Sequence, residues 1–384
     1  MRILKIEFRN VGIFDNGFII DFVARDKVTE KHNVYNYHGA FSTQNTIALI
    51  GPNASGKTSA LKLITMALEI ILKQQTLKNI RIPNGIIKDN TVMKVDFYDS
   101  KTKLYYRLES IFDYNYTSED ELPVLKYSSE NLYRKKSTHV KSKIQTTDFS
   151  VENIITTRDE LREEISFLRD DDSILFFLVK LEDKSQKKYS KSLINENMFD
   201  FYRVSGNASM IDINIFDDSI DELSLEESQL KVKFKNKQKE YSCSSMPDQN
   251  YLLSSGTVKG GNILFWLKGI IRNGGYLIID ELENHFHKRI VQFIIDLFND
   301  SEINRYGATL VFTTHYAEIL DSIERKDNVL ILVRDSAYTC NIIRYSDEIK
   351  RIENKKSEVF LSNYIKGTSP AYKSIQAFKE SIWI

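Results

Sequence analysis

Residues 51–58 read GPNASGKT, and this stretch constrains the fold more than any other part of the chain. An apolar run, IALI, precedes Gly51, and apolar residues recur at helical spacing after Thr58, so the stretch is a turn between a buried strand and a helix. Gly51 and Gly56 allow successive N–H groups to point at one anion, and the helix start adds positive potential. The pattern predicts a phosphate-binding loop; the plainer alternative is a glycine-containing turn beside a solvated lysine.

Two side chains of this loop have distinct expected roles. We expect Lys57 to reach the β and γ phosphates of a nucleotide and Thr58 to place its hydroxyl on magnesium. The residues expected to bind the nucleotide here are Gly51, Pro52, Asn53, Ala54, Ser55, Gly56, Lys57, Thr58 and Ser59.

Two later apolar strands end in polar side chains. YLIIDE at 276–281 ends in Asp280 and Glu281, and TLVFTTH at 309–315 ends in His315. Because parallel strands open onto a ligand crevice at their carboxyl ends, Asp280 is expected to hold magnesium through water and Glu281 to orient the attacking water. His315 is expected to sense the γ phosphate or that water. The alternatives are an acidic turn and an ordinary surface or core histidine.

The stretch LSSGT at 253–257 is expected to begin a helix. Ser254, Ser255 and Gly256 would expose backbone N–H groups and a hydroxyl at the helix start, which suits the γ phosphate of a nucleotide held by another subunit. The alternative is a plain serine cap of the helix.

Taken in order, these motifs resemble those of ABC-type AAA family ATPases of the RecF/SMC-like clade, in particular the compact ATPases of bacterial abortive-infection and anti-phage defence operons. MRILKIEFRNVGIF resembles the first strand of that group, and DELENHFH its carboxylate strand and following turn; the resemblance covers about residues 1–110 and 246–384. It implies an α/β P-loop NTPase fold of ABC-ATPase type. Such a fold has a mixed central sheet, an antiparallel subsheet and an inserted, largely helical region.

The resemblance also implies an activity and partners. It implies magnesium-dependent hydrolysis of ATP to ADP and phosphate, with Glu281, His315 and Lys57 as catalytic residues. Two subunits would hold each nucleotide between the phosphate loop of one and Ser254 and Gly256 of the other, so a homodimer or higher homo-oligomer is expected. A separate effector protein, a nuclease or a toxin, is the further partner that the resemblance implies.

Three departures from the family pattern bear on function. Ser255 stands where transporter-type members carry Gly, and Thr257 where they carry Gln, so an energising subunit of a transporter is disfavoured. No glutamine stands at the end of TVMKVDFYDS, residues 91–100, where the family would supply a further magnesium ligand. The main alternative function is a RecF-like ATPase of DNA repair or maintenance, which requires a basic face.

The charge balance argues against a general attraction to nucleic acid. The 384 residues include 53 Lys and Arg against 53 Asp and Glu, so any contact with DNA or RNA must be local. RKKSTHVKSK at 134–143 is the candidate basic run, with a solvated surface as the alternative. No apolar run approaches the roughly 20 residues that span a bilayer, and the start lacks a signal peptide, which predicts a cytoplasmic protein without membrane contact.

Three parts are expected along the chain. Residues 1–115 would carry the phosphate loop and the antiparallel subsheet, including a hairpin at 96–112. Residues 116–245 are polar and charge-rich, and would form an inserted helical or lid region that transmits the nucleotide state to a partner. Residues 246–384 would return to the ATPase domain with the LSSGT stretch, the carboxylate strand and His315.

Overall fold

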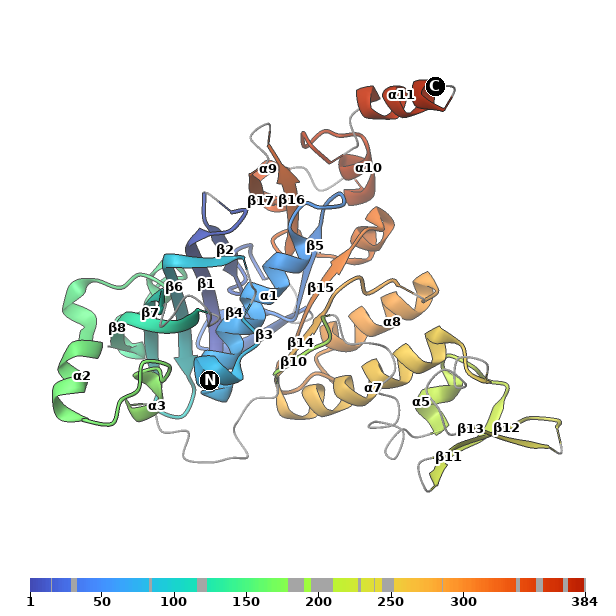
Figure 1. The fold of residues 1–384 in the computed structure, drawn as a ribbon, viewed down its shortest axis with the longest axis horizontal. Helices are drawn as coiled ribbons and strands as arrows, with labels where there is room; N and C mark the ends of the chain where they lie inside the picture. Colours follow the sequence, from blue (N-terminus) through green and yellow to red (C-terminus); the bar gives the residue numbers. More distant parts are fainter. Residues whose placement is uncertain are drawn as a thin grey trace.

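Two six-stranded sheets organise the chain, and one helix packs against both of them (Figure 1). The computed structural model describes residues 1–14, 16–28, 33–82, 85–115, 123–178, 190–194, 210–226, 229–237, 239–243, 252–284, 286–335, 339–349, 355–368 and 372–382.

The central sheet has the strand order β10-β14-β15-β5-β16-β17. Its strands are β10 (Ser190–Ser192), β14 (Tyr276–Ile279), β15 (Thr309–Thr314), β5 (Thr46–Ile50), β16 (Val329–Arg334) and β17 (Cys340–Arg344). The first five run parallel to their neighbours, and β17 pairs with β16 in the antiparallel direction. Strands β5, β14 and β15 are buried along their whole length, as parallel strands covered on both faces are. Because β5, β14 and β15 run in the same direction, their carboxyl ends meet at one edge of the sheet.

The second sheet is antiparallel and has the order β2-β1-β6-β7-β8-β9. Its strands are β1 (Arg2–Val11), β2 (Phe18–Asp21), β6 (Ile87–Asp99), β7 (Leu104–Asn115), β8 (Val124–Lys136) and β9 (Ile154–Thr157). The pairing of Asp99 with Leu104 closes the β6–β7 hairpin, so the hairpin predicted at 96–112 is confirmed. The mixed central sheet and the antiparallel subsheet of the predicted fold class are both present.

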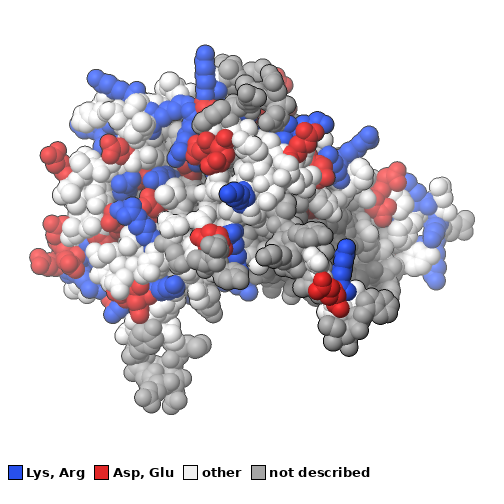
Figure 2. All heavy atoms as spheres, turned by 90° about the horizontal axis from the view of Figure 1, so that it is seen from above, with Lys and Arg blue, Asp and Glu red and all other residues white. Residues whose placement is uncertain are grey.

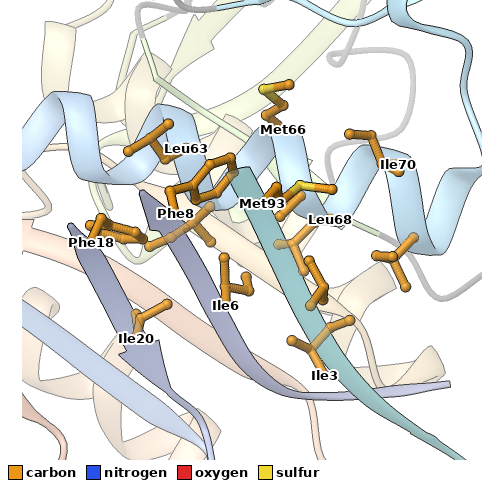
Figure 3. Close-up of a cluster of buried hydrophobic side chains, with 14 of the residues drawn as sticks. Ile3, Ile6, Phe8, Phe18, Ile20, Leu63, Met66, Leu68, Ile70 and Met93 are labelled. Atoms are coloured by element: carbon orange, nitrogen blue, oxygen red, sulfur yellow. The ribbon is translucent and has the colours of Figure 1, made fainter. Parts of the chain in front are cut away.

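Helix α1 (Lys57–Leu68) fills the space between the two sheets. Figure 3 shows Leu63, Met66 and Leu68 of this helix beside apolar side chains of the antiparallel sheet. The labelled sheet residues are Ile3, Ile6, Phe8, Phe18, Ile20 and Met93. Ile47 and Leu49 of β5 belong to the same buried cluster, so burial of this apolar surface fixes α1, and with it the turn at its start, against the central sheet.

The opposite face of the central sheet is covered by α7 (Ser255–Asn273) and α8 (Lys288–Asn299). Strand β5 alternates between the two faces: Ala48 and Ile50 join the cluster under α7 and α8, whereas Ile47 and Leu49 join the cluster under α1. The strand that leads into residues 51–58 is therefore packed against apolar side chains on both faces of the sheet.

The described part of residues 116–245 contains more strand than helix, so the expectation of a largely helical insertion is wrong for these residues. Strands β8 and β9 extend the antiparallel sheet, and β10 forms one edge of the central sheet. A separate sheet holds β11 (Ile220–Glu226), β12 (Gln229–Phe234) and β13 (Glu240–Cys243), while the helices α2 (Arg158–Glu164), α3 (Leu175–Leu178) and α5 (Met210–Asn214) are short. Strand β8 pairs with β7, and its Leu125, Tyr127 and Leu132 pack into the buried cluster around α1. Polar and charged residues between them mask this pattern in the sequence. The domain boundaries at 115 and 245 stay a prediction.

The remaining elements are short or lie towards the C-terminus. They are β3 (Val34–His38), β4 (Phe41–Gln44), η1 (Glu69–Lys73), η2 (Leu77–Asn79), η3 (Ser137–His139), η4 (Ile144–Thr146), η5 (Val151–Asn153), η8 (Ala317–Ser322), α9 (Tyr345–Glu348), α10 (Lys356–Leu361) and α11 (Tyr372–Ser381). Among the helices that the structure describes, none combines the length and the apolar character needed to cross a membrane.

A buried ion pair attaches the segment after β9 to the antiparallel sheet. Glu130 of β8 is 0% exposed and Arg158 of α2 is 1% exposed, with 2.7 Å between Arg158 Nη1 and Glu130 Oε2. The same carboxylate accepts hydrogen bonds from Ser173 Oγ at 2.7 Å and Ile174 N at 3.0 Å. Burial raises the pKa of Glu130, and Arg158 together with these hydrogen bonds opposes that shift.

Replacing Arg158 by Met should destabilise the protein strongly, because Glu130 would then be buried without a counter-charge. We expect a loss of about 3–5 kcal/mol in the free energy of unfolding, measured by urea denaturation at neutral pH. The matched control is Arg162→Met, which removes a solvent-exposed pair with Asp170 and should cost about 1 kcal/mol or less. Adding Glu130→Gln to Arg158→Met should recover part of the loss. Equal destabilisation by the Arg158 and Arg162 variants would contradict this account.

Candidate functional site

The turn between β5 and α1 has the backbone geometry that an anion-binding loop requires. Ala54 and Gly56 adopt positive φ angles of 60° and 93°, which reverses the chain before the helix starts. A Cβ atom on Gly51 would lie 2.3 Å from the carbonyl oxygen of Leu332 on β16 and 2.5 Å from Ser55 Oγ. Glycine at position 51 is therefore required by the close approach of two backbones. Asn53 and Ala54 form the exposed tip of the turn.

Lys57 lies folded over this loop. Its Nζ donates hydrogen bonds to the carbonyl oxygens of Gly51 at 2.8 Å and Pro52 at 2.9 Å, and the residue is 6% exposed. Burial lowers the pKa of Lys57, and the carboxylates of Asp280 and Glu281 partly offset this effect. The lysine is thus held in the loop by two neutral carbonyl oxygens. A negatively charged acceptor can replace them.

Ser55 and Ser59 complete the loop. Ser55 is 1% exposed, and its buried Oγ has no hydrogen-bond partner, which is uncommon for a buried hydroxyl. Ser59 lies in the first turn of α1 and is partly exposed. A bound anion in the loop would supply Ser55 with the acceptor that the protein itself does not provide.

Asp280 joins the loop to two neighbouring strands. It follows β14, and its carboxylate accepts hydrogen bonds from Thr58 Oγ1 at 2.7 Å and from Thr313 Oγ1 at 2.5 Å. Thr58 lies in the first turn of α1, and Thr313 lies near the end of β15, so one carboxylate connects β14, β15 and the start of α1. The structure brings Thr58 and Asp280, the two predicted magnesium ligands, into direct contact.

Glu281 and His315 form a second contact at the same edge. His315 Nε2 lies 3.3 Å from Glu281 Oε1, and the side chains are 31% and 48% exposed. Glu281 has a φ of 49°, in the left-handed region that residues other than glycine rarely adopt. Its N–H donates to Thr313 Oγ1 at 2.7 Å, which helps to hold this conformation. Backbone strain of this kind concentrates at functional sites.

Glu283 is a site residue that the sequence analysis missed. It is 7% exposed; its Oε1 accepts a hydrogen bond from the backbone N–H of His315 at 2.5 Å, and its buried Oε2 has no hydrogen-bond partner. The signal was its place in the acidic turn DELEN, two residues after Glu281. Its place at the site depends on contact with His315, directly after β15, which is distant in sequence.

The LSSGT stretch lies at the start of α7, as predicted. Ser254 caps the helix: its Oγ accepts a hydrogen bond from Thr257 N at 3.0 Å. Ser254 and Ser255 are exposed, and Gly256 is partly exposed. The plain capping role is therefore real, and it leaves the surface of Ser254, Ser255 and Gly256 open to another molecule. Contact with a nucleotide held by another subunit stays a prediction.

The further magnesium ligand expected after residues 91–100 stays unidentified. Residues 91–100 fall largely in β6, which belongs to the antiparallel sheet. Strand β14 pairs in parallel with β15 on one side and with β10 on the other, and the N–H of Leu193, just beyond β10, donates to the carbonyl of Ile278 at 2.8 Å. Sheet order, which the sequence does not display, decides which strand ends beside Asp280.

Comparison with known proteins identifies the family. Residues 47–321, from β5 to η8, match the family described as "AAA domain, putative AbiEii toxin, Type IV TA system". The chain belongs to this family. Family membership implies ATP binding and ATPase activity, and it confirms the predicted resemblance to AAA ATPases of abortive-infection systems. Among solved structures, the chain is similar to an SMC head domain from Thermotoga maritima, with 12% identity and a TM-score of 0.40, over 90% of this chain and 99% of that one. No curated protein matches the chain.

Gly51→Ala should disturb the loop, because the added Cβ would meet the backbone oxygen of Leu332. We expect a loss of about 1–3 kcal/mol in the free energy of unfolding and weaker nucleotide binding, measured by denaturation and by titration with a fluorescent ATP analogue. Gly269→Ala is the matched control. Gly269 lies in helix α7, and a Cβ there would meet nothing within 4 Å apart from the adjoining backbone of the helix itself, so the change should stabilise the protein by roughly 0.5–1 kcal/mol. Normal stability and nucleotide binding in Gly51→Ala would refute the close-approach explanation.

Proposed function

We propose that this protein is an ABC-type ATPase that binds and hydrolyses ATP, dimerises around the nucleotide, and controls a partner effector in bacterial anti-phage defence. One observation carries the proposal: Lys57, Thr58, Asp280, Glu281 and His315 lie together at the carboxyl edge of the central sheet. Open parallel sheets bind their ligands at this edge. The chemistry proposed for each residue follows from its place there.

The phosphate loop provides the binding site for the triphosphate. Its backbone N–H groups and the start of α1 favour an anion. Lys57 adds a positive charge, and its Nζ donates hydrogen bonds to the loop carbonyls. Phosphate oxygens are stronger acceptors than those carbonyls, so Lys57 would exchange its partners when ATP binds. The unpartnered Oγ of Ser55 supports a further contact with the ligand.

Thr58 and Asp280 fit a magnesium site. A hydroxyl and a carboxylate are the hard oxygen donors that Mg²⁺ prefers, and their oxygens are 2.7 Å apart. When bound, Mg²⁺ would neutralise charge on the phosphate oxygens. Thr313 keeps the Asp280 carboxylate oriented through its hydrogen bond at 2.5 Å.

Glu281 and His315 are proposed to orient the attacking water. Phosphoryl transfer depends on a positioned nucleophile more than on covalent help from the protein, and a carboxylate next to an imidazole can hold a water molecule in place. The oxygen of this water forms the new bond to the γ phosphorus as the bond to the ADP oxygen breaks. The products are ADP and phosphate, with one proton released.

The exposed start of α7 supports the proposal of a dimer. Ser254, Ser255 and Gly256 are open to solvent at a helix start, where N–H groups favour an anion. We propose that they contact the γ phosphate of ATP bound to a partner copy. Because ADP lacks that phosphate, the closed dimer would form with ATP and open after hydrolysis.

The proposed defence role draws on the family description, which names a toxin and a type IV toxin–antitoxin system. An ATPase whose assembly depends on its nucleotide is suited to restrain or release an effector protein.

A RecF-like role in DNA maintenance is the alternative, and it requires a basic face. The basic run at 134–143 presents fewer lysines for contact with a phosphate backbone than its sequence suggests. The Nζ atoms of Lys135 and Lys143 donate hydrogen bonds to backbone carbonyl oxygens of the protein itself. Figure 2 shows positive and negative side chains interspersed on one face of the molecule.

Lys57→Ala should abolish ATP binding or reduce it severely, because the loop would lose its only side-chain cation. Isothermal titration with ATP and Mg²⁺ measures the effect. Lys62→Ala, on the same helix but beyond the loop, is the matched control and should bind ATP normally. Equal ATP affinity in the Lys57 variant and the wild type would refute the phosphate-loop assignment.

Glu281→Gln should bind ATP but hydrolyse it slowly, and therefore accumulate the closed dimer. Light scattering coupled to size exclusion, with ATP, with ADP and without nucleotide, measures the mass of the assembly. We expect a dimer with ATP and a smaller species in the other two conditions. A monomer under all three conditions would exclude the shared nucleotide site. Salt-dependent binding of DNA by the isolated protein would instead favour the RecF-like alternative.

A further inference from the structure

Lys259 connects the LSSGT helix to the loop that carries Glu281. It lies early in α7, and its Nζ donates to the backbone carbonyl oxygens of Glu281 at 3.2 Å and Asn284 at 2.9 Å. The same ammonium group lies 5.4 Å from the centroid of the Phe286 ring. All three contacts are to the segment between β14 and α8, so a single lysine spans the gap between two elements that are separate in sequence.

The opposite side of this segment is held by β15. Glu281 N donates to Thr313 Oγ1 at 2.7 Å, Leu282 N donates to the carbonyl oxygen of Thr313 at 3.1 Å, and Glu283 accepts from the N–H of His315 at 2.5 Å. The segment is therefore fastened between β15 and α7. A left-handed residue such as Glu281, with a φ of 49°, persists only when its surroundings hold it. Lys259 provides the fastening on the α7 side.

The charges around Lys259 agree with this role. Burial lowers the pKa of Lys259, and the carboxylates of Glu283 and Glu281 partly offset that effect. The acidic segment thus provides the countercharge for a lysine that is partly withdrawn from water. A neutral side chain at position 259 would lose both the hydrogen bonds to the carbonyls and this attraction.

We propose that Lys259 is a positioning residue that couples the two nucleotide sites of the dimer, an inference that rests on the proposed function. Ser254 of a protomer contacts the nucleotide of its partner, whereas Glu281 of the same protomer acts on its own nucleotide. Lys259 ties the helix that carries Ser254 to the backbone of Glu281. When the γ phosphate of the partner's ATP fixes the start of α7, Lys259 carries that constraint to the Glu281–His315 pair.

Two consequences separate coupling from simple support of the fold. Hydrolysis at one site should depend on ATP at the other, so wild-type turnover should be cooperative in ATP concentration. Loss of Lys259 should reduce the catalytic rate and the cooperativity while leaving ATP affinity unchanged, because Lys57, Thr58 and Asp280 remain in place. A purely structural lysine would change thermal stability and ATP affinity together.

The test compares Lys259→Met and Lys259→Arg with the control Lys288→Gln, which removes a positive charge from the exposed first residue of α8. For each variant, kcat and the Hill coefficient come from steady-state phosphate release, ATP affinity from titration, and Tm from thermal unfolding. Lys259→Met should lower kcat by roughly ten- to a hundredfold and lose cooperativity, at unchanged ATP affinity and with only a small decrease in Tm. Lys259→Arg should retain a large part of both properties, since its guanidinium also donates to carbonyls.

The outcomes distinguish this inference from the function on which it rests. An active wild type whose Lys259→Met variant matches Lys288→Gln in kcat and Hill coefficient would overturn the coupling role alone. A non-cooperative wild type would also overturn it. A wild type that neither hydrolyses ATP nor dimerises would overturn the proposed function, and the coupling role with it.

Discussion

The arrangement of the site depends on the hydrogen bonds that the carboxylate of Asp280 accepts. By accepting hydrogen bonds from Thr58 and Thr313, it holds together the start of α1 and the ends of β14 and β15. Such a contact is possible because parallel pairing places Ile279 opposite Phe312 and Thr313 opposite Leu49, so the ends of β14, β15 and β5 lie level at one edge. A shift in register by a single residue would turn these side chains to the other faces of the sheet.

The two apolar clusters keep that edge rigid. One packs α1 between the central and antiparallel sheets, and the other packs α7 and α8 on the opposite face. Because the side chains of β5 alternate between the clusters, the strand cannot move without disturbing both. The loop at 51–56 and the segment at 280–284 are therefore short, constrained connections on a fixed base. This rigidity allows strained backbone at Ala54 and Glu281, which a less supported loop would relax.

Much of the site could be predicted from local sequence, and the residues that were missed share one cause. Asp280, Glu281 and His315 could be predicted because a buried strand followed by a polar residue is a local pattern. Lys57 and Thr58 could be predicted from the glycine spacing of residues 51–58, which is local as well. Glu283 and Lys259 were missed because their partners are backbone groups of other elements, and such contacts leave no spacing in the sequence. The expected helical insertion was wrong in its described part, since β8 is stabilised by pairing with β7 and its charged residues mask the alternation of buried side chains.

The sequence by itself determined the phosphate loop, the polar ends of β14 and β15, and the serine cap at the start of α7. These features depend on backbone freedom at glycine, on runs of apolar residues and on capping chemistry, all of which act within a few residues. Only the tertiary structure decided that β10 rather than β6 lies beside β14, that Glu281 adopts a left-handed conformation, and that Lys259 joins α7 to the Glu281 backbone. Those outcomes depend on sheet order and on packing between distant segments, which are properties of the whole fold.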